Sequence, residues 1–454
     1  MVSMQTLRIG NGCGFWGDNL DAPIFLARDG KLDVLTLEYL AELTMSILAL
    51  QKQRDPDVGY AADFLDVLER LVPILKQQPN LKIITNAGGM NPQACARKAR
   101  EILKRGGLAG KRIGVVSGDD LLPRLDELIA KGHMLTNLDN GAALASVRSP
   151  VVSANAYLGA RPIVEALARG ANVIVTGRVA DASLTVAPAA HAFHWKWDDW
   201  DRLGGATVAG HLIECGAQVT GGLWCHWDQA PDLAHVGYPF VDVEADGGFT
   251  ISKPAGSGGA VNLETVSEQL LYEVGDPAAY LTPDVVADFT SVQLRSMGPD
   301  WVQVSPARGK PATDTYKVSI AYRNGFQASG TLVMIGPNAV AKAQHSGEML
   351  IERLRRIGIV PERHLIETLG TGACVPGVLR DAPEPVEIVL RVSVQDSRRA
   401  VVERFTKEFA PLVTSGPPGV TGYTTGRPPV REVFAYWPAL IDKRVVTPCV
   451  EVLP

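Results

Sequence analysis

The chain has 454 residues, of which 46% are hydrophobic and 20% are charged, values typical of a globular protein with two domains. A formal charge of −5 argues against nucleic acid as the main partner, because phosphate binding requires a basic face. The N-terminus lacks a signal-peptide pattern, no apolar run is long enough to span a membrane, and the six scattered cysteines form no C-x-x-C pair. We therefore expect a cytoplasmic protein without disulfides and without a membrane partner.

The first half of the chain alternates short β-branched runs with amphipathic stretches, a pattern typical of βα units and a parallel sheet. The predicted strands are residues 7–10, 82–86, 112–117, 150–155 and 172–176, and the predicted helices are 32–50, 61–77, 93–105, 122–131 and 162–169. Asp33 and Asn91 are the expected N-caps, and Gly106, Gly132 and Gly170 the expected helix ends. We predict a doubly wound, mostly parallel α/β domain over residues 1–295.

A smaller domain is expected over residues 296–454. Alternating runs at 314–321 and 327–335 flank Arg323-Asn324-Gly325, which is an Asn-Gly hairpin signal. Further strands are predicted at 364–369, 386–394 and 430–436, and helices at 338–357 and 397–409. Several strands combined with two helices indicate a two-layer α+β sandwich.

Each predicted strand of the first domain is followed by small and polar residues. In chain order these segments contain Asn11 and Asp18, then Asn86, then Asp119, then Asn155 and Tyr157, and finally Arg178, Asp181 and Ser183. Ligands of open parallel sheets bind outside the carboxyl ends of the strands, so the pattern predicts one site at this edge. Polar residues are common in any βα loop, so each segment alone also has a purely structural explanation.

Known nucleotide-binding fingerprints do not account for these segments. Gly10-Asn11-Gly12-Cys13-Gly14 lacks the G-x-G-x-x-G spacing, and no acidic residue ends a second strand about 20 residues later. A Lys-Ser/Thr pair of the Walker type is missing as well. We therefore reject a dinucleotide fold and a P-loop.

A second candidate is a glycine-rich loop before a predicted helix at 262–274, for which Asn262 is the expected N-cap. The loop contains Lys253, Gly256, Ser257, Gly258 and Gly259. Free N–H groups at a helix N-terminus, together with a mobile lysine, suit phosphate, pyrophosphate or carboxylate. A flexible turn before a capped helix explains the same residues equally well.

A third candidate places His211, Glu214 and Cys215 on one face of a helix, because they are three and four residues apart. An imidazole next to a carboxylate can act as a general base or acid near neutral pH. A structural pair at a helix end is the alternative. His191 and His194 are also three apart, but no second pair with ligand spacing follows, so no metal site is expected.

Several of these segments resemble the acyclic terpene utilisation A (AtuA-like) family. The resemblance rests on Gly14-Phe15-Trp16-Gly17-Asp18, Thr85-Asn86-Ala87-Gly88-Gly89, Asn155-Ala156-Tyr157-Leu158-Gly159, Gly177-Arg178-Val179-Ala180-Asp181-Ala182-Ser183, and the later blocks around His211 and Lys253. It covers nearly the whole chain, and the block around Arg178 and Asp181 is the most specific.

The resemblance implies a catabolic enzyme for branched acyclic terpenoids such as citronellol and geraniol, which are degraded as CoA thioesters. The implied reaction is a lyase step that cleaves a 3-hydroxy-3-substituted glutaryl-CoA into acetate and a shorter acyl-CoA, or the hydration of an enoyl-CoA. No tightly bound cofactor is expected, because coenzyme A would enter as part of a small-molecule carboxylate or acyl-CoA substrate. A homo-oligomer is compatible with this reading.

For such chemistry, Asp181 or the His211–Glu214 pair would be the base, and Arg178 would hold a substrate carboxylate. Asn86 and Asn155 would donate to the thioester carbonyl, and the Lys253 loop would take the anionic tail. Asn11, Asp18, Tyr157 and Ser183 complete the expected substrate-binding surface.

Two other functions fit the same residues. A non-catalytic ligand-binding or assembly subunit that partners a carboxylase or hydratase would use similar Asn, Gly and Arg loops. A hydrolase with Cys215 or Cys13 as nucleophile is the second alternative.

Overall fold

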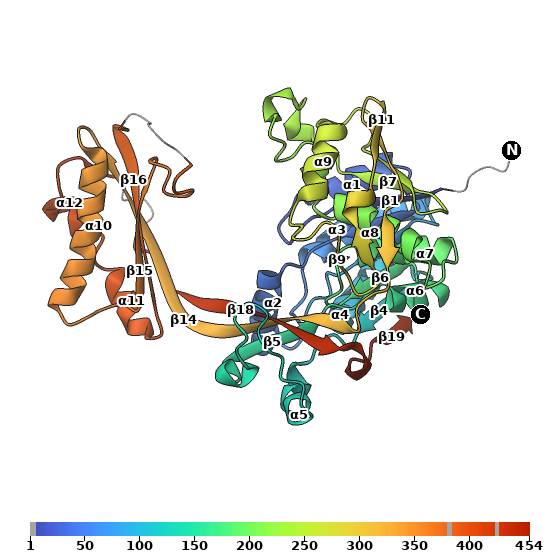
Figure 1. Ribbon diagram of the computed structural model, residues 1–454, viewed down its shortest axis with the longest axis horizontal. Helices are drawn as coiled ribbons and strands as arrows, with labels where there is room; N and C mark the ends of the chain where they lie inside the picture. Colours follow the sequence, from blue (N-terminus) through green and yellow to red (C-terminus); the bar gives the residue numbers. More distant parts are fainter. Residues whose placement is uncertain (1–5, 379–383, 423–425) are drawn as a thin grey trace. The chain divides into compact units, whose positions relative to one another are not determined.

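The computed structural model describes residues 6–378, 384–422 and 426–454. The chain forms two compact units, Met1–Ala321 with Tyr436–Pro454, and Tyr322–Ala435 (Figure 1). The first unit therefore includes residues 296–321 and 436–454, beyond the predicted boundary at 295/296. No helix in the described part of the chain is long and apolar enough to cross a membrane.

The first unit is built on a ten-stranded mixed sheet with the order β11-β12-β8-β7-β1-β2-β3-β6-β4-β19. Its parallel centre consists of β1 (Leu7–Asn11), β2 (Val34–Leu37), β3 (Lys82–Thr85), β6 (Val173–Thr176) and β4 (Ile113–Ser117). Antiparallel strands flank the centre: β7 (Phe240–Val243), β8 (Phe249–Ser252), β12 (Trp301–Val304) and β11 (Leu294–Gly298) on one side, and β19 (Cys449–Leu453) on the other. The α/β class is confirmed, with a sheet that is mixed rather than mostly parallel.

Two predictions for the first unit differ from the structure, one in the type of element and one in the pairing of a strand. The predicted helix at 32–50 contains β2, a loop at 38–41, and α2 (Glu42–Arg54). All four residues of β2 are buried, and a short apolar run of this kind gives no periodicity that separates strand from helix. The predicted strand at 150–155 exists as β5 (Val151–Ala156), but it pairs with β14 (Thr315–Ile335) instead of joining the large sheet.

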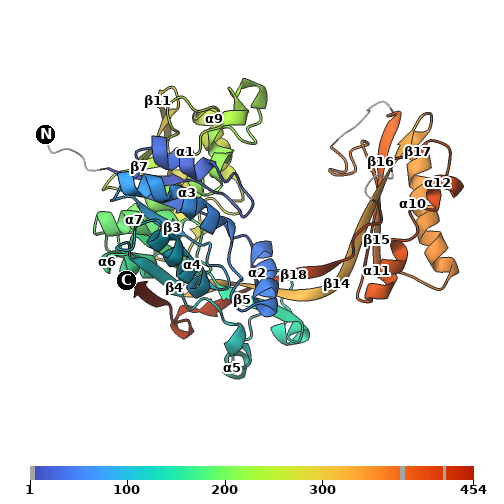
Figure 2. The ribbon, with the colours of Figure 1, turned by 180° about the vertical axis from the view of Figure 1, so that it is seen from behind.

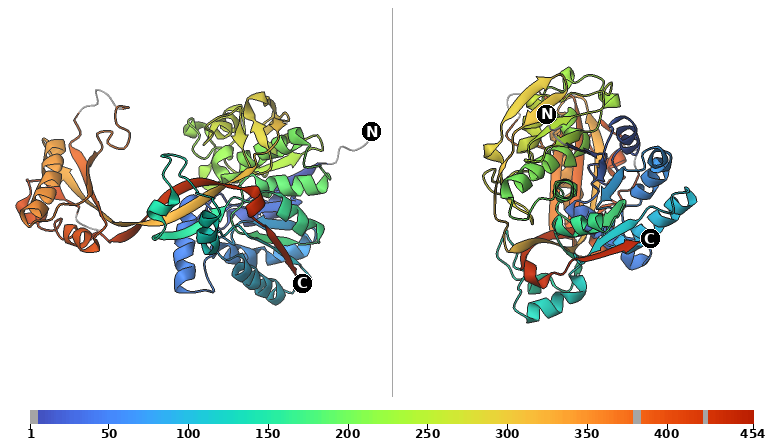
Figure 3. Two further views of the ribbon diagram at one scale, coloured as in Figure 1. Left: turned by 60° about the horizontal axis from the view of Figure 1, so that its bottom comes forward. Right: turned by 90° about the vertical axis from the view of Figure 1, so that its right-hand side faces the viewer.

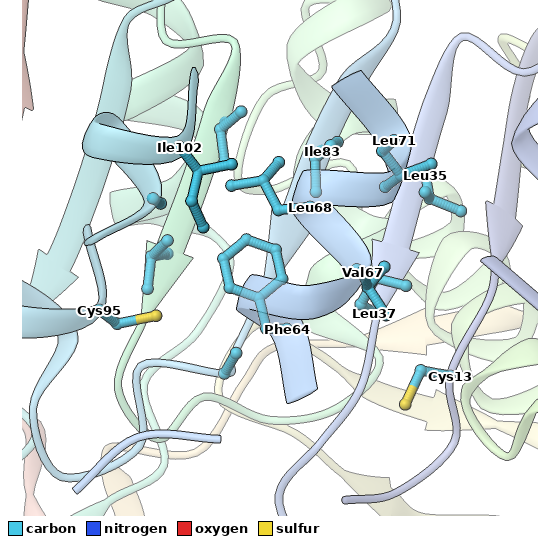
Figure 4. Close-up of a cluster of buried hydrophobic side chains, with 14 of the residues drawn as sticks. Cys13, Leu35, Leu37, Phe64, Val67, Leu68, Leu71, Ile83, Cys95 and Ile102 are labelled. Carbon is cyan, nitrogen blue, oxygen red and sulfur yellow. The ribbon is translucent and has the colours of Figure 1, made fainter. Parts of the chain in front are cut away.

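Helices cover both faces of the central strands. Ile113 and Val115 of β4 belong to a core cluster with Phe64 of α3 (Asp63–Gln77) and Cys95 of α4 (Pro92–Arg105) (Figure 4). Between them, a Cβ on Gly114 would lie 3.0 Å from Ala166 of α6 (Arg161–Ala168). Because successive side chains of a strand point to opposite faces, α4 and α6 lie on opposite sides of the sheet.

The remaining helices of the first unit extend these two layers. They are α1 (Ala22–Asp29), α5 (Leu125–Ala130), α7 (Ser183–Ala192), α8 (Trp200–Glu214) and α9 (Leu263–Leu271). The helices α6, α7 and α8 pack in succession, and α8 also contacts a small antiparallel sheet of β9 (Tyr280–Leu281), β10 (Val286–Asp288) and β13 (Arg308–Lys310) (Figures 1 and 2). The C-terminal end of α8 thereby comes close to β1.

Most of the predicted capping residues occupy the expected positions. Asn91 accepts a hydrogen bond from the first turn of α4, and Asn262 does the same for α9. Gly106 ends α4, as predicted. The exception is Asp33, which precedes β2 and accepts a hydrogen bond from the backbone N–H of Arg8 at 2.9 Å.

The second unit is a two-layer α+β arrangement, as predicted for this region. Its sheet has the order β15-β16-β14-β17, and β18 also pairs with β14. The strands are β15 (Arg363–Leu369), β16 (Glu387–Asp396), β17 (Val420–Thr421) and β18 (Arg431–Asp442), and the helices are α10 (Ala339–Arg356), α11 (Arg399–Phe405) and α12 (Leu412–Ser415) (Figure 3). Leu332, Leu350, Leu390 and Phe405 are among the buried residues of its core.

The predicted hairpin at Arg323-Asn324-Gly325 is absent, because these three residues lie inside the single strand β14. Gly325 has a φ of +83°, and a Cβ there would lie 2.6 Å from the carbonyl oxygen of Asp396 on the neighbouring strand. The Asn-Gly pair is therefore accommodated within the ladder instead of reversing the chain.

Candidate active site

Strand-end segments of the first unit converge on a cleft of about 480 Å³ at the carboxyl edge of the parallel strands. The segments after β1, β2 and β6 contribute to it, together with the C-terminal end of α8. Gly14 allows this approach, since a Cβ there would lie 2.7 Å from the carbonyl carbon of Cys215. A larger hollow of about 720 Å³ lies at the amino ends of β1, β2 and β3, away from the strand-end loops.

The lining of the cleft is strongly acidic. Its six carboxyl groups belong to Asp18, Glu38, Glu42, Asp181, Glu214 and Glu273. Arg178 is the only cationic residue among the described residues that line it. An acidic lining of this kind supplies proton donors and acceptors, but its ionised groups repel a free carboxylate of a ligand.

Arg178 is buried at the base of the cleft and is held by several partners. Its Nη1 donates to the carbonyl oxygen of Leu40 at 2.6 Å, and its Nη2 donates to Oδ1 of Asp181 at 2.7 Å. The guanidinium also lies 4.2 Å from the centre of the Tyr157 ring and 3.9 Å from Oε1 of Glu38. The expected bidentate grip on a substrate carboxylate would therefore compete with these partners.

Asp181 is the more exposed of the two carboxylates that contact Arg178, since 36% of its side chain is exposed and Glu38 is almost fully buried. Burial of the surrounding segment raises the pKa of Asp181, and the positive charge of Arg178 acts against this increase. The ion pair with Arg178 fixes Oδ1 and leaves Oδ2 for a ligand. Asp181 therefore has the position and the charge of a general base.

His211 and Glu214 form a pair in which only Glu214 lines the cleft. Nδ1 of His211 lies 3.1 Å from Oε1 of Glu214, and Nε2 lies 2.9 Å from the carbonyl oxygen of Gln269. Since a carbonyl oxygen can only accept, Nε2 carries a hydrogen and the other ring nitrogen shares a proton with Glu214. Burial raises the pKa of Glu214 to about 7, and the charges of Asp181 and Glu273 add to this increase.

Tyr157 contacts the network from behind the cleft. Its hydroxyl group donates to Oε1 of Glu42 at 2.7 Å, and Nζ of Lys317 donates to the same oxygen at 3.1 Å. Burial acts to raise the pKa of Glu42, but the Tyr157 hydrogen bond and the charges of Lys317 and Arg178 lower it to about 2. Glu42 is therefore a permanent negative charge beside Asp181.

A family model described as acyclic terpene utilisation family protein AtuA matches residues 7–452 of the 454. The chain belongs to the acyclic terpene utilisation family. No curated protein and no solved structure matches it. The resemblance read from the sequence blocks is thus confirmed, and the most specific block supplies both Arg178 and Asp181 to the cleft of this family member.

Asn11, one of the expected substrate-binding residues, is buried and serves the scaffold. Its Nδ2 donates to the carbonyl oxygens of Cys13, Ile213 and Glu214 at 2.8 to 2.9 Å. These bonds tie the end of β1 to the last turn of α8, whose carbonyl groups have no partner within the helix. Asn11 therefore positions Glu214 and does not face the cleft.

Asn155 and Ser183 also lie outside the cleft lining, and both hydrogen-bond to buried carboxylates. Nδ2 of Asn155 donates to Asp119 at 2.8 Å, and the same carboxylate accepts from the backbone N–H of Arg178 at 2.9 Å. The hydroxyl group of Ser183 donates to Asp284 at 2.8 Å. Asn155 and Ser183 hold the segment around Arg178 in place, so they support the site from behind.

The Lys253 loop does not form the expected anion cradle. Nζ of Lys253 lies 3.0 Å from Asp300, donates to the carbonyl oxygen of Ser257 at 2.8 Å, and is almost fully buried. The backbone N–H groups of Ser257, Gly258 and Gly259 donate to loop carbonyl oxygens at 3.2, 2.8 and 2.6 Å. Because the following helix is capped by its own Asn262, the donors proposed for an anion are used within the protein.

Replacing Lys253 by methionine is expected to leave the affinity for phosphate or pyrophosphate unchanged and to lower the free energy of unfolding of the first unit by about 1.5–3 kcal/mol, the usual contribution of a hydrogen bond to a charged group. All eight tryptophans lie in this unit, so tryptophan fluorescence in urea reports its unfolding. Lys98→Met, at an exposed ion pair, is the matched control. A loss of affinity for these anions with unchanged stability would restore the loop as a binding site.

The cysteine nucleophile receives no support from the structure. Burial raises the pKa of the Cys13 thiol, which donates to the carbonyl oxygen of Phe15 at 3.2 Å. Burial, followed by the charge of Glu214, raises the pKa of the Cys215 thiol well above its usual range. A thiol without thiolate character is a poor nucleophile. Within the described ranges, no three His, Cys, Asp or Glu residues are grouped so that they could hold a metal ion.

Sequence reasoning missed three carboxyl groups that line the cleft, Glu38, Glu42 and Glu273, and also Lys317, the partner of Glu42. Glu38 and Glu42 follow β2, the strand that was read as part of a helix. Lys317 belongs to β14 and reaches Glu42 from a position 275 residues later in the chain, without lining the cleft itself. The apolar run of β2 followed directly by an acidic residue was the available signal for Glu38.

Proposed function

We propose that the protein is an acid–base lyase or hydratase that acts on a branched acyclic acyl-CoA thioester. The observation that supports this most is the presence of two carboxyl groups with different surroundings in one cleft, Asp181 beside Arg178 and Glu214 beside His211. Pairs of titratable groups whose environments differ in this way divide the roles of base and acid between them. Membership of the acyclic terpene utilisation family supports the substrate class.

The two reactions need the same groups. In the lyase direction, Asp181 takes the proton of the tertiary hydroxyl group, the adjacent carbon–carbon bond breaks, and its electron pair moves onto the departing carbon as an enolate. Glu214 then returns a proton to that carbon. In hydration, Asp181 takes a proton from water, the oxygen adds to the β-carbon, and Glu214 protonates the α-carbon. Coenzyme A enters as part of the substrate, and no further cofactor takes part in either sequence.

The acidic lining favours one orientation of the substrate. The ionised members of the six carboxyl groups repel a free carboxylate, and Arg178 is already paired. In the hydration, the uncharged thioester or its enolate is therefore the part of the substrate that contacts Asp181 and Glu214, and the carboxylated or nucleotide end lies outside the cleft. This differs from the expectation that Arg178 would clamp the carboxylate. In the lyase direction the departing carbon carries the free carboxylate, so this lining favours the hydration over the cleavage that yields acetate.

The pH dependence follows from the role of Glu214 as the acid. We expect kcat/KM to fall as the pH rises through about 7, because Glu214 must hold its proton and its pKa is raised to about 7. His211 lowers the pKa of Glu214, so His211→Phe should move this falling limb to higher pH. His345→Phe, an exposed residue of the second unit, is the control. A limb that stays in place in His211→Phe would contradict the assignment.

Product analysis tests the proposed function. The full-length protein is incubated with a 3-hydroxy-3-substituted glutaryl-CoA and with α,β-unsaturated branched acyl-CoA thioesters, and products are identified by mass spectrometry. We expect either acetate with a shorter acyl-CoA, or a 3-hydroxyacyl-CoA. Tight binding of these thioesters without any turnover would instead favour a non-catalytic binding subunit.

A further inference from the structure

Glu38 is a buried residue whose carboxyl group belongs to the lining of the cleft. It is the first residue after β2, only 4% of its surface is exposed, and it lines the cleft together with Arg178 and Asp181. The chemistry described above gives it no role. A buried carboxyl group at the edge of a candidate active site calls for a physical explanation, because burying it without partners is costly.

The two oxygens of Glu38 have different surroundings. Oε1 accepts from the backbone N–H of Leu40 at 2.9 Å and from Nδ2 of Asn86. The orientation of the Asn86 amide is fixed, since its Oδ1 accepts from the backbone N–H of Tyr39 at 2.8 Å. Oε1 is therefore an acceptor only, and it has no room for a proton of its own.

Oε2 has no hydrogen-bond partner among the described residues, although it is buried. Burial, followed by the negative charge of Asp181, raises the pKa of Glu38 well above its usual range, and Arg178 only partly offsets this. These surroundings favour the neutral carboxyl group, and its proton lies on Oε2, because Oε1 faces two donors. An unpartnered O–H group next to the cleft requires an acceptor, which a ligand oxygen can supply.

We propose that Glu38 is a protonated carboxylic acid whose Oε2–H donates a hydrogen bond to the thioester carbonyl oxygen of the bound acyl group, where enolate charge develops during the hydration. This inference rests on the proposed function. Donors aimed at the oxygen that gains charge stabilise the transition state more than the ground state. Asn86, which had been assigned to the carbonyl, is then a positioning residue that acts through Glu38. Glu38 forms and breaks no covalent bond, so its proton stays in place throughout.

Two substitutions test whether Glu38 acts as a neutral hydrogen-bond donor or as an ionised carboxylate. In Glu38→Gln the amide oxygen can accept from Leu40 and Asn86, which places the NH₂ group where Oε2–H was. Glu38→Met has a similar size and no donor. We expect E38Q to lose less than about tenfold in kcat and E38M to lose about 10²–10³-fold, the usual effect of removing one donor to an oxyanion. If E38Q is as inactive as E38M, a negative charge is needed and the inference is wrong.

A binding measurement checks the inference independently of turnover. Calorimetric titration compares a branched acyl-CoA with its thioether analogue, which lacks the carbonyl oxygen, on the wild type, E38Q and E38M. We expect E38M to bind the thioester about tenfold more weakly than the wild type, as for loss of one hydrogen bond, and to bind the thioether unchanged. An equal loss for both ligands, or no binding of either by the wild type, would overturn the inference.

The two proposals fail in different ways. If the wild type turns over no thioester but E38M shows the carbonyl-dependent loss of affinity, the reaction is wrong and the donor role of Glu38 stands. If the wild type is active and the loss of affinity does not depend on the carbonyl, the reaction stands and Glu38 is not the donor. Thermal unfolding of both variants confirms that the comparison is made on folded protein.

Discussion

Replacing Asp181 by asparagine is expected to lower kcat by about 10³-fold, within the range known for loss of a positioned general base. The amide keeps an oxygen for the hydrogen bond from Nη2 of Arg178, so the fold should be retained. Because the group lost acts on a proton and not on ligand binding, the affinity for an acyl-CoA should change little. Steady-state kinetics and calorimetric binding on the same preparation measure both quantities.

The control for this substitution is Asp57→Asn. Asp57 is also an aspartate with an arginine partner, Arg97 at 3.5 Å, but 82% of its side chain is exposed and it lies outside the cleft. Its substitution should leave kcat unchanged. If D181N kept near wild-type turnover, Asp181 would only hold Arg178, and the base would have to be sought elsewhere in the cleft.

Replacing Arg178 by methionine is expected to lower the free energy of unfolding of the first unit by about 3 kcal/mol, because removing one partner leaves the others uncompensated in a buried place. The carbonyl oxygen of Leu40 and the carboxylate of Asp181 both lose a donor at less than 3 Å. Without the positive charge the pKa of Asp181 should rise further, so activity should be lost as well. Urea unfolding followed by tryptophan fluorescence gives the stability.

Lysine at position 178 is not expected to restore the full stability of the first unit. The guanidinium reaches Leu40 and Asp181 with two separate nitrogens, and an ammonium group offers a single point charge in place of this fork. Arg178→Lys should therefore recover only part of the lost stability. The control is Arg28→Met, an exposed arginine paired with Asp29, which should leave the unfolding midpoint where it is. Equal midpoints for R178M and R28M would show that the network does not hold the site together.

The parts of the fold that were predictable depend on local pattern. Runs of β-branched residues gave β1, β3, β4 and β6 to within about two residues, a normal accuracy for strand ends, and Asn91 and Asn262 cap the helices they were expected to cap. The incorrect predictions concern features, such as strand pairing, that depend on tertiary contacts. The strand β5 pairs with β14, and β19 joins β4 from the far end of the chain, and neither pairing leaves a local trace.

Sequence patterns predicted the edge of the sheet at which the candidate site lies, but only some of the residues that line the cleft. Strand-end reasoning brought Asp18, Arg178 and Asp181 to the cleft, and helical spacing brought Glu214. The Asn side chains of the same segments turned out to bond inward, because buried backbone and carboxyl groups compete for them. The rule that locates the edge does not say which side of each loop faces the ligand.

Incorporation of solvent deuterium into the product tests acid–base catalysis in this cleft most directly. The protein is incubated in D₂O with the thioesters used for product analysis, and the label is located by NMR. We predict one deuterium on the carbon that Glu214 protonates, that is, in acetate for the lyase or at the α-carbon for the hydratase, with D181N at least about 10²-fold slower. Bound thioester that never acquires deuterium with the wild type would contradict acid–base catalysis in this cleft.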